Sequence, residues 1–153
     1  MLVKKGVGFN SIDDLNSASA IVCAPEGSTN IELLRKNEGN RFGNLVVLAK
    51  PDVTDCLVAM QQGQADGATG DDTVLAGLAA QDPNTEVVGE KFTDEPYGLG
   101  MGKDKVDFVK FVNSVIEQMR TDGRWAAIYS KWLVGVLSDA VIDPPPAVYG
   151  REP

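Results

Sequence analysis

Two adjacent carboxylates, Asp71 and Asp72, follow a short run of small residues and precede an apolar stretch that is compatible with a helix. If residues 66–70 form a strand, Asp71 lies at its C-terminal end, where open α/β sheets bind their ligands. A carboxylate at that edge can bind an ammonium group. The alternative is that Asp71 or Asp72 only caps the following helix, because aspartate is among the preferred N-cap residues.

A second segment could bind the opposite charge. An apolar stretch at 20–24 leads through a Pro-Glu pair to Gly27, Ser28 and Thr29, and a helical pattern follows. Gly27 permits unusual backbone conformations, and Ser28 or Thr29 can cap the helix. The first amides of that helix and the two hydroxyls can hold a carboxylate or phosphate. Together with Asp71, this segment indicates a site for the α-carboxylate and α-ammonium groups of an amino acid.

The composition disfavours the common catalytic and metal sites. The chain of 153 residues has no histidine and two cysteines. A Ser-His-Asp or Cys-His arrangement therefore cannot be built, and a closed zinc site lacks ligands. The glycines at 6–8 and 98–102 do not have the spacing of a dinucleotide-binding fingerprint. We expect no catalytic residue, no metal ion and no cofactor.

Charge and hydropathy predict a folded chain that does not bind nucleic acid. Hydrophobic residues make up 43% of the chain and charged residues 24%, which allows a buried core in one domain of ordinary size. The net charge is −8, and no basic stripe with interleaved aromatic residues is present. No apolar run approaches the ~20 residues of a membrane helix. The first six residues do not resemble a signal peptide.

Hydrophobic patterning predicts that short strands alternate with helices in the first part of the chain. We expect strands at about 20–24, 45–49, 66–70 and 85–88. Helices are expected at 28–37, 54–62 and 72–80, and a short helix should follow a capping box formed by Ser11 and Asp14. This order is typical of an α/β fold with a mainly parallel sheet and helices on both faces.

The C-terminal region has a different character. Asp104 can cap a long helix, Asp122 and Gly123 interrupt it, and a second helix follows. An aromatic and aliphatic face on that second helix is typical of a core or an interface. Its residues are Trp125, Ile128 and Trp132.

Five motifs occur in a characteristic order over residues 1 to about 134. They are GST at 27–29, TDC at 54–56, GQADGATGDDTVLAG at 63–77, EVVGEKFTDEPYGLGMGKD at 86–104 and TDGRWAAIYSKW at 121–132. In this order they resemble the polar amino-acid solute-binding proteins of bacterial ABC importers, a family that includes glutamate/aspartate receptors. The resemblance implies a periplasmic-binding-protein-like fold. It also implies that a polar or acidic L-amino acid is bound for uptake by hinge closure.

The resemblance assigns roles to the two candidate segments. In the family, the residue matching Asp71 binds the ligand's α-ammonium group, and the positions matching Ser28 and Thr29, beside Gly27, bind its α-carboxylate. Glutamate or aspartate is favoured as the ligand, and glutamine and asparagine stay open. Gly70 departs from the family pattern, because relatives often carry a side chain there that reaches the ligand; the glycine is expected to leave extra room.

The resemblance also implies that the chain holds part of a two-lobed protein, with an artificial start at Met1. Residues 3–95 would be the second ligand-binding lobe, and 96–101 a hinge strand that returns from it. Residues 102–134 would be C-terminal helices that pack on the other lobe, followed by an extended proline-rich tail at 135–153. The expected hinge residues are Lys4, Gly6, Tyr97 and Gly98. Because the other lobe would be missing, the face of the second C-terminal helix would be exposed, and the chain would self-associate.

The two cysteines, Cys23 and Cys56, have two interpretations. One is a pair of buried free thiols, since unpaired cysteine packs like a small hydrophobic residue. An even cysteine count in an exported family favours a Cys23–Cys56 disulfide instead. The resemblance implies an extracytoplasmic location, periplasmic or as a cell-surface lipoprotein, with the targeting segment absent from this chain.

The implied partners are a small amino acid and a membrane permease of the ABC transporter. Two other functions stay open at this point. One is a sensory domain for amino acids, which would share the fold and the site. The other is a dehydratase-like enzyme on the same fold, although the lack of histidine disfavours it.

Overall fold

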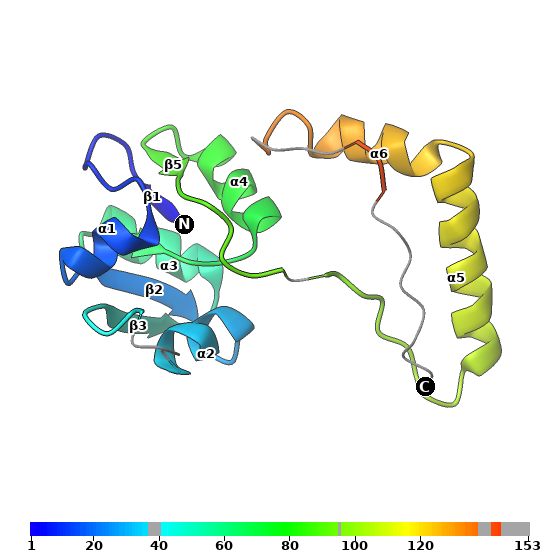
Figure 1. Ribbon diagram of the computed structural model, residues 1–153, viewed down its shortest axis with the longest axis horizontal. Helices are drawn as coiled ribbons and strands as arrows, with labels where there is room; N and C mark the ends of the chain where they lie inside the picture. Colours follow the sequence, from blue (N-terminus) through cyan, green and yellow to red (C-terminus); the bar gives the residue numbers. More distant parts are fainter. Residues whose placement is uncertain (37–40, 95, 138–141, 145–153) are drawn as a thin grey trace. The chain divides into compact units, whose positions relative to one another are not determined.

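The computed structural model describes residues 1–36, 41–94, 96–137 and 142–144 (Figure 1). The chain divides into two compact units, Met1–Asp94 and Glu95–Pro153. Most of the proline-rich tail expected at 135–153 lies outside the described residues. Within the described residues, no helix is long and apolar enough to cross a membrane.

The first unit is built on a five-stranded sheet with the strand order β3-β2-β4-β1-β5. β2 pairs in parallel with β3 and β4, whereas β1 pairs antiparallel with β4 and β5. Four strands therefore share one direction, which confirms the mainly parallel sheet, and β1 is the antiparallel exception. The strands are β1 Leu2–Lys4, β2 Ile21–Pro25, β3 Val46–Lys50, β4 Gly67–Ala68 and β5 Thr85–Val87.

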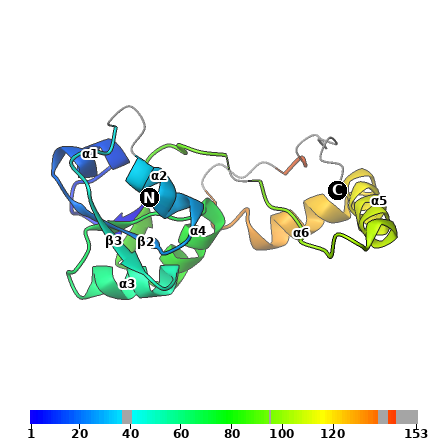
Figure 2. The same cartoon turned by 90° about the horizontal axis from the view of Figure 1, so that it is seen from below.

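Helices cover both faces of this sheet, as the alternating pattern predicted (Figure 2). Apolar residues of α1 and α2 pack in one buried cluster, and those of α3 and α4 pack in another. Val22 and Ala24 of β2 belong to the first cluster and Cys23 to the second, because successive strand side chains point to opposite faces. The helices are α1 Ile12–Ser17, α2 Thr29–Lys36, α3 Val53–Gln61 and α4 Asp72–Gln81.

Side chains fix where α1 and α3 begin. The Ser11 hydroxyl accepts a hydrogen bond from the Asp14 amide at 3.2 Å, and the Asp52 carboxylate accepts one from the Asp55 amide at 2.9 Å. The Asp14 carboxylate reaches back to the amide of Asn10 rather than that of Ser11. The expected capping box is therefore formed with its return bond shifted by one residue.

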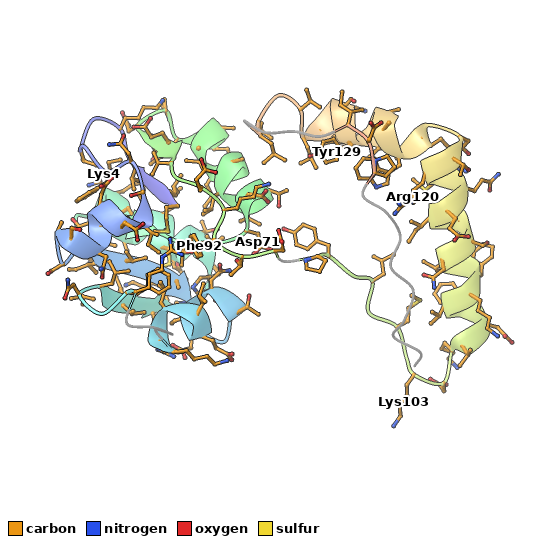
Figure 3. All side chains as sticks on the ribbon, viewed as in Figure 1. Lys4, Asp71, Phe92, Lys103, Arg120 and Tyr129 are labelled. Atoms are coloured by element: carbon orange, nitrogen blue, oxygen red, sulfur yellow. A yellow bond between two sulfur atoms is a disulfide. The ribbon has the colours of Figure 1, made fainter. Side chains whose placement is uncertain are left out.

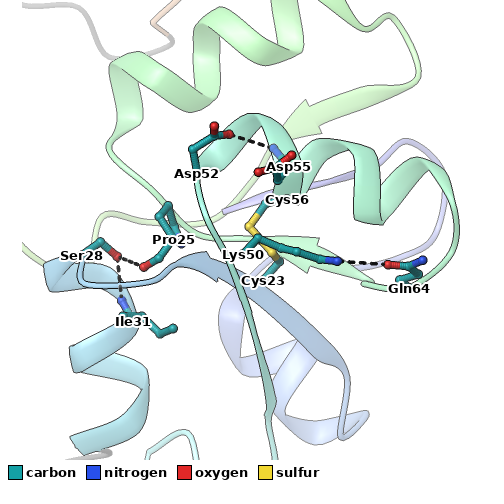
Figure 4. The surroundings of a disulfide bond; sticks show 9 residues. All are labelled: Cys23, Pro25, Ser28, Ile31, Lys50, Asp52, Asp55, Cys56 and Gln64. Carbon is teal, nitrogen blue, oxygen red and sulfur yellow. Dashed lines mark hydrogen bonds between the residues drawn. A yellow bond between two sulfur atoms is a disulfide. The ribbon is translucent and has the colours of Figure 1, made fainter.

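Cys23 in β2 and Cys56 in α3 form a disulfide, with 5.5 Å between their Cα atoms (Figure 4). Both residues are fully buried. The bridge ties α3 to the interior of the sheet, since β2 lies between β3 and β4. The disulfide prediction is confirmed, and the free-thiol alternative is not.

The second unit contains α5 Val106–Thr121 and α6 Arg124–Trp132, separated at Asp122 and Gly123 as predicted. Gly123 has a φ of 85°, which favours glycine. The prediction that Asp104 caps α5 was wrong, because Lys105 occupies the N-cap position. The Asp104 carboxylate instead pairs with Lys105 Nζ at 2.9 Å.

The expected hinge residues lie in different environments. Lys4 ends β1, and Gly6 lies in the following turn with a φ of 76°. Tyr97 and Gly98 are exposed and lie outside any strand of the described chain, and the hinge role of residues 96–101 stays a prediction.

Candidate functional site

The N-termini of two helices meet beyond the C-terminal ends of β2 and β4. α2 begins shortly after β2, and α4 begins shortly after β4. A side chain from α2 joins them: Asn30 Nδ2 donates a hydrogen bond to Asp71 Oδ1 at 3.4 Å. Asp71 lies where the chain enters α4 (Figure 3). The structure therefore brings together the two segments that the sequence predicted to bind opposite charges.

Ser28 caps α2, which was one of the roles expected of it. Its hydroxyl accepts a hydrogen bond from the Ile31 amide at 3.2 Å and donates one to the Pro25 carbonyl at 2.7 Å (Figure 4). The cap satisfies one of the helix's first amides. Because the hydroxyl proton is bound to Pro25, Ser28 must release that carbonyl before it can donate to a ligand.

The other hydrogen-bond donors at the start of α2 are not occupied by acceptors of the described chain. The amides of Thr29 and Asn30 have no acceptor within the described part of the chain, and neither has the exposed Thr29 hydroxyl. Gly27 has a φ of 75°, in the left-handed region that glycine adopts without strain, and so permits the turn into the helix. This end of α2 can therefore bind an anion through helix amides and a hydroxyl.

The two aspartates of the doublet differ in their contacts. Asp71 occupies the N-cap position of α4, but its side chain makes no capping hydrogen bond. Asp72 has both oxygens engaged: Oδ1 accepts from the Thr73 amide at 2.7 Å, and Oδ2 pairs with Lys91 Nζ at 2.9 Å. The alternative that Asp71 serves only as a side-chain cap is therefore not what the structure shows.

A charge next to the anion-binding segment is compensated within α2. Glu26 precedes Gly27 and would repel a bound carboxylate. Both carboxylate oxygens of Glu26 accept hydrogen bonds from Arg35, at 2.7 and 2.9 Å. These bonds hold the pKa of Glu26 below its usual value. The flanking acid is thus balanced by a bidentate arginine.

Gly70 does not leave the extra room that its small size suggested. A Cβ atom on Gly70 would lie 3.3 Å from Leu75 Cδ2 and 3.6 Å from Val53 Cγ2. The first distance is tighter than an ordinary contact, so a larger residue would push against apolar side chains of α3 and α4. A side chain at position 70 would therefore compete for space with the packing between α3 and α4.

The sequence did not single out Thr69, which lies between β4 and Asp71. The residue is 1% exposed, and its hydroxyl has no hydrogen-bond partner among the described residues. Buried hydroxyl groups usually have a partner, and an unmade bond costs about 1–3 kcal/mol. No sequence signal distinguishes this threonine from a strand residue.

Replacing Thr69 by valine is expected to leave the free energy of unfolding unchanged or to raise it by up to about 1 kcal/mol, because no hydrogen bond is lost. Thr85 provides the matched control, since it is also buried but donates to the Asp82 carbonyl at 3.0 Å. Thr85→Val should lower the stability by about 1 kcal/mol. Urea unfolding of both variants checks this. A larger loss for Thr69→Val than for Thr85→Val would show that the Thr69 hydroxyl has a partner in solution.

Several proteins of known function are similar to this chain in sequence. No family model matches the chain. The ABC transporter glutamine-binding protein GlnH of Bacillus subtilis is 33% identical over 133 residues, which cover 87% of this chain and 47% of that protein. The glutamate/aspartate import solute-binding protein of Salmonella typhimurium is 32% identical over 136 residues, covering 86% and 44%. The chain thus spans about half the length of the curated relatives that it matches.

A solved structure extends the similarity from sequence to fold. An ancestral arginine-binding protein bound to glutamine superposes with a TM-score of 0.71 at 27% identity, over 86% of this chain and 57% of that one. Within the described residues, no group of three or more potential ligands could hold a metal ion. The mixed sheet, the flanking helices and these relatives together show that the chain is similar in sequence and fold to about half of an amino-acid solute-binding protein of a bacterial ABC importer.

Proposed function

We propose that the unit Met1–Asp94 is a ligand-binding lobe that holds the charged groups of an amino acid for import by an ABC transporter. The observation that carries this proposal is the contact between Asn30 and Asp71. It brings the first amides of α2, which attract an anion, next to the Asp71 carboxylate, which attracts a cation. A zwitterion such as an amino acid needs both: a group that binds its carboxylate and, next to it, a group that binds its ammonium. Helix N-termini attract anions, and a half-buried aspartate attracts an ammonium group.

The donors at the start of α2 bind the α-carboxylate in this proposal. They are the amides of Thr29 and Asn30 and the Thr29 hydroxyl, with the Ser28 hydroxyl joining once it releases Pro25. Gly27 permits the turn that brings these donors together. The Asp71 carboxylate binds the α-ammonium group, while Asp72 stays engaged with Lys91.

The ligand is a polar or acidic amino acid, with glutamate or aspartate favoured and glutamine or asparagine as the next candidates. The relatives support this set, since they are named for glutamine and for glutamate/aspartate. In this proposal a second lobe closes over the ligand about a hinge, and the closed form docks on a membrane permease. The buried disulfide favours an extracytoplasmic location, in the periplasm or on the cell surface as a lipoprotein.

An NMR titration of the labelled chain with these four amino acids tests the proposal. We expect at least one of them to shift the amide signals of residues 28–31 and 70–73 in a saturable manner, with the remaining signals largely unchanged. Uniformly small, non-saturating shifts for all four would contradict it. A sensory domain would give the same titration, and uptake measurements in cells that depend on the protein would separate sensing from transport.

We also propose that the chain self-associates through its C-terminal helices. Neither α5 nor α6 contains a buried residue, and Ile128 and Trp132 are 50% and 65% exposed. Exposed apolar faces of this kind promote association. Light scattering should show a mass that rises with concentration for the wild type and stays near that of a monomer for Ile128→Lys/Trp132→Lys. A monomeric wild type at high concentration would contradict this proposal.

A further inference from the structure

Lys91 places a positive charge at the N-terminus of α4. The residue follows β5, and its Nζ lies 2.9 Å from Asp72 Oδ2. A cation at a helix N-terminus is unfavourable against the helix dipole. The pairing with Asp72 offsets this cost, so that Lys91 and Asp72 together place a neutral pair beside Asp71.

The formal charges of this group sum to −1, from two aspartates and one lysine. An uncompensated doublet would present two adjacent negative charges, which suit a ligand with two positive charges. A compensated doublet suits a single ammonium group. A carboxylate is likewise paired with a cation at the N-terminal end of α2, where Arg35 balances Glu26. At both poles, the carboxylate that does not bind ligand in the proposed function has a cation of its own.

We propose that Lys91 sets the charge selectivity of the site: it favours amino acids with neutral or acidic side chains and disfavours those with cationic side chains, such as arginine and lysine. This inference rests on the proposed function. A cationic side chain would meet the like charge of Lys91 and find Asp72 already paired, and specificity often comes from such a repulsive element. Because Lys91 offsets the charge of Asp72, an acidic side chain is repelled less than by an uncompensated doublet, and neutral side chains are little affected.

The effect should be moderate, because the Lys91 and Asp72 side chains are 53% and 38% exposed. Water and salt screen charges in such positions. Removal of one unit charge at this range should change the affinity of a charged ligand by about three- to tenfold at low ionic strength. The change should have opposite signs for arginine and glutamate and should be small for glutamine.

Three substitutions of Lys91 and one control test the inference in the intact chain. Dissociation constants for glutamate, glutamine and arginine are measured by NMR titration at low salt. Lys91→Gln should raise the affinity for arginine relative to glutamate by about threefold or more, and Lys91→Glu should raise it further. Lys91→Arg should behave like the wild type. The control is Lys36→Gln, which removes the same charge and an ion pair to Glu32 near the other end of α2, and it should leave the ratio unchanged.

Each outcome decides the inference. The inference is supported if the affinity for free arginine relative to free glutamate rises from Lys91→Arg through Lys91→Gln to Lys91→Glu and does not change in the control variant. An unchanged ratio in a chain that still binds amino acids overturns the inference and leaves the proposed function intact. An equal change in the control also overturns it, because the effect would then be one of net charge alone. If no amino acid binds the wild type, the proposed function fails and the inference fails with it.

Discussion

Asp71→Asn is expected to weaken amino-acid binding by about a hundredfold or more in the complete receptor. The substitution keeps the size of the side chain but removes the charge that, in the proposed function, faces the ligand's ammonium group. Removing one partner of a desolvated ion pair strands the other at a cost of roughly 3–5 kcal/mol, and each ~1.4 kcal/mol is a tenfold change in affinity. Isothermal titration calorimetry with the preferred amino acid measures the loss.

Asp72→Asn is the matched control for this experiment, one residue further along the chain. It removes an exposed ion pair with Lys91, which is worth little, and keeps an oxygen that can accept from the Thr73 amide. We expect a loss of less than about tenfold. Small and equal losses at the two positions would contradict the assignment of Asp71 to the ammonium group.

Loss of the Cys23–Cys56 disulfide is expected to lower the free energy of unfolding by about 3–4 kcal/mol. The bridge spans 33 residues, and a cross-link over a loop of this length restricts the unfolded chain by that amount in the chain-entropy model. Urea unfolding of the oxidised and the reduced protein measures the difference. The Cys23→Ala/Cys56→Ala variant is the control, because its stability should not respond to the reductant.

Thiol titration gives an independent check on the same bond. The denatured, unreduced protein should contain no titratable thiol, since the described chain has no free cysteine. Two titratable thiols per chain, or equal stability before and after reduction, would contradict the disulfide.

Local sequence patterns predicted most of the first unit. The apolar stretch before Gly27 forms β2, and the run of small residues before Asp71 contains β4; the helices that follow begin within two residues of their expected positions. β4 is shorter than expected, at two residues rather than five. Backbone hydrogen bonds to β2 nevertheless continue on both sides of it, since the amides of Asp66 and Thr69 donate to the carbonyls of Ile21 and Cys23 at 2.8 and 2.9 Å.

The residues that the sequence missed act through contacts between distant segments. Lys91 reaches Asp72 from beyond β5, and Asn30 reaches Asp71 from another helix. Neither contact has a fixed spacing along the chain. Asn30 could have been suspected, because it directly follows Thr29 at the start of a helix with open amides.

In the proposed function, α2 and Asp71 hold the two charged groups of one ligand. The most direct test is an NMR titration of the labelled chain with the amino acid that binds best and with its analogue lacking the α-ammonium group. We expect the amino acid to shift the amides of both segments, 28–31 and 70–73. The analogue should bind much more weakly and shift mainly the first segment. Equal affinities, with the same shifts at 70–73 for both compounds, would contradict the claim.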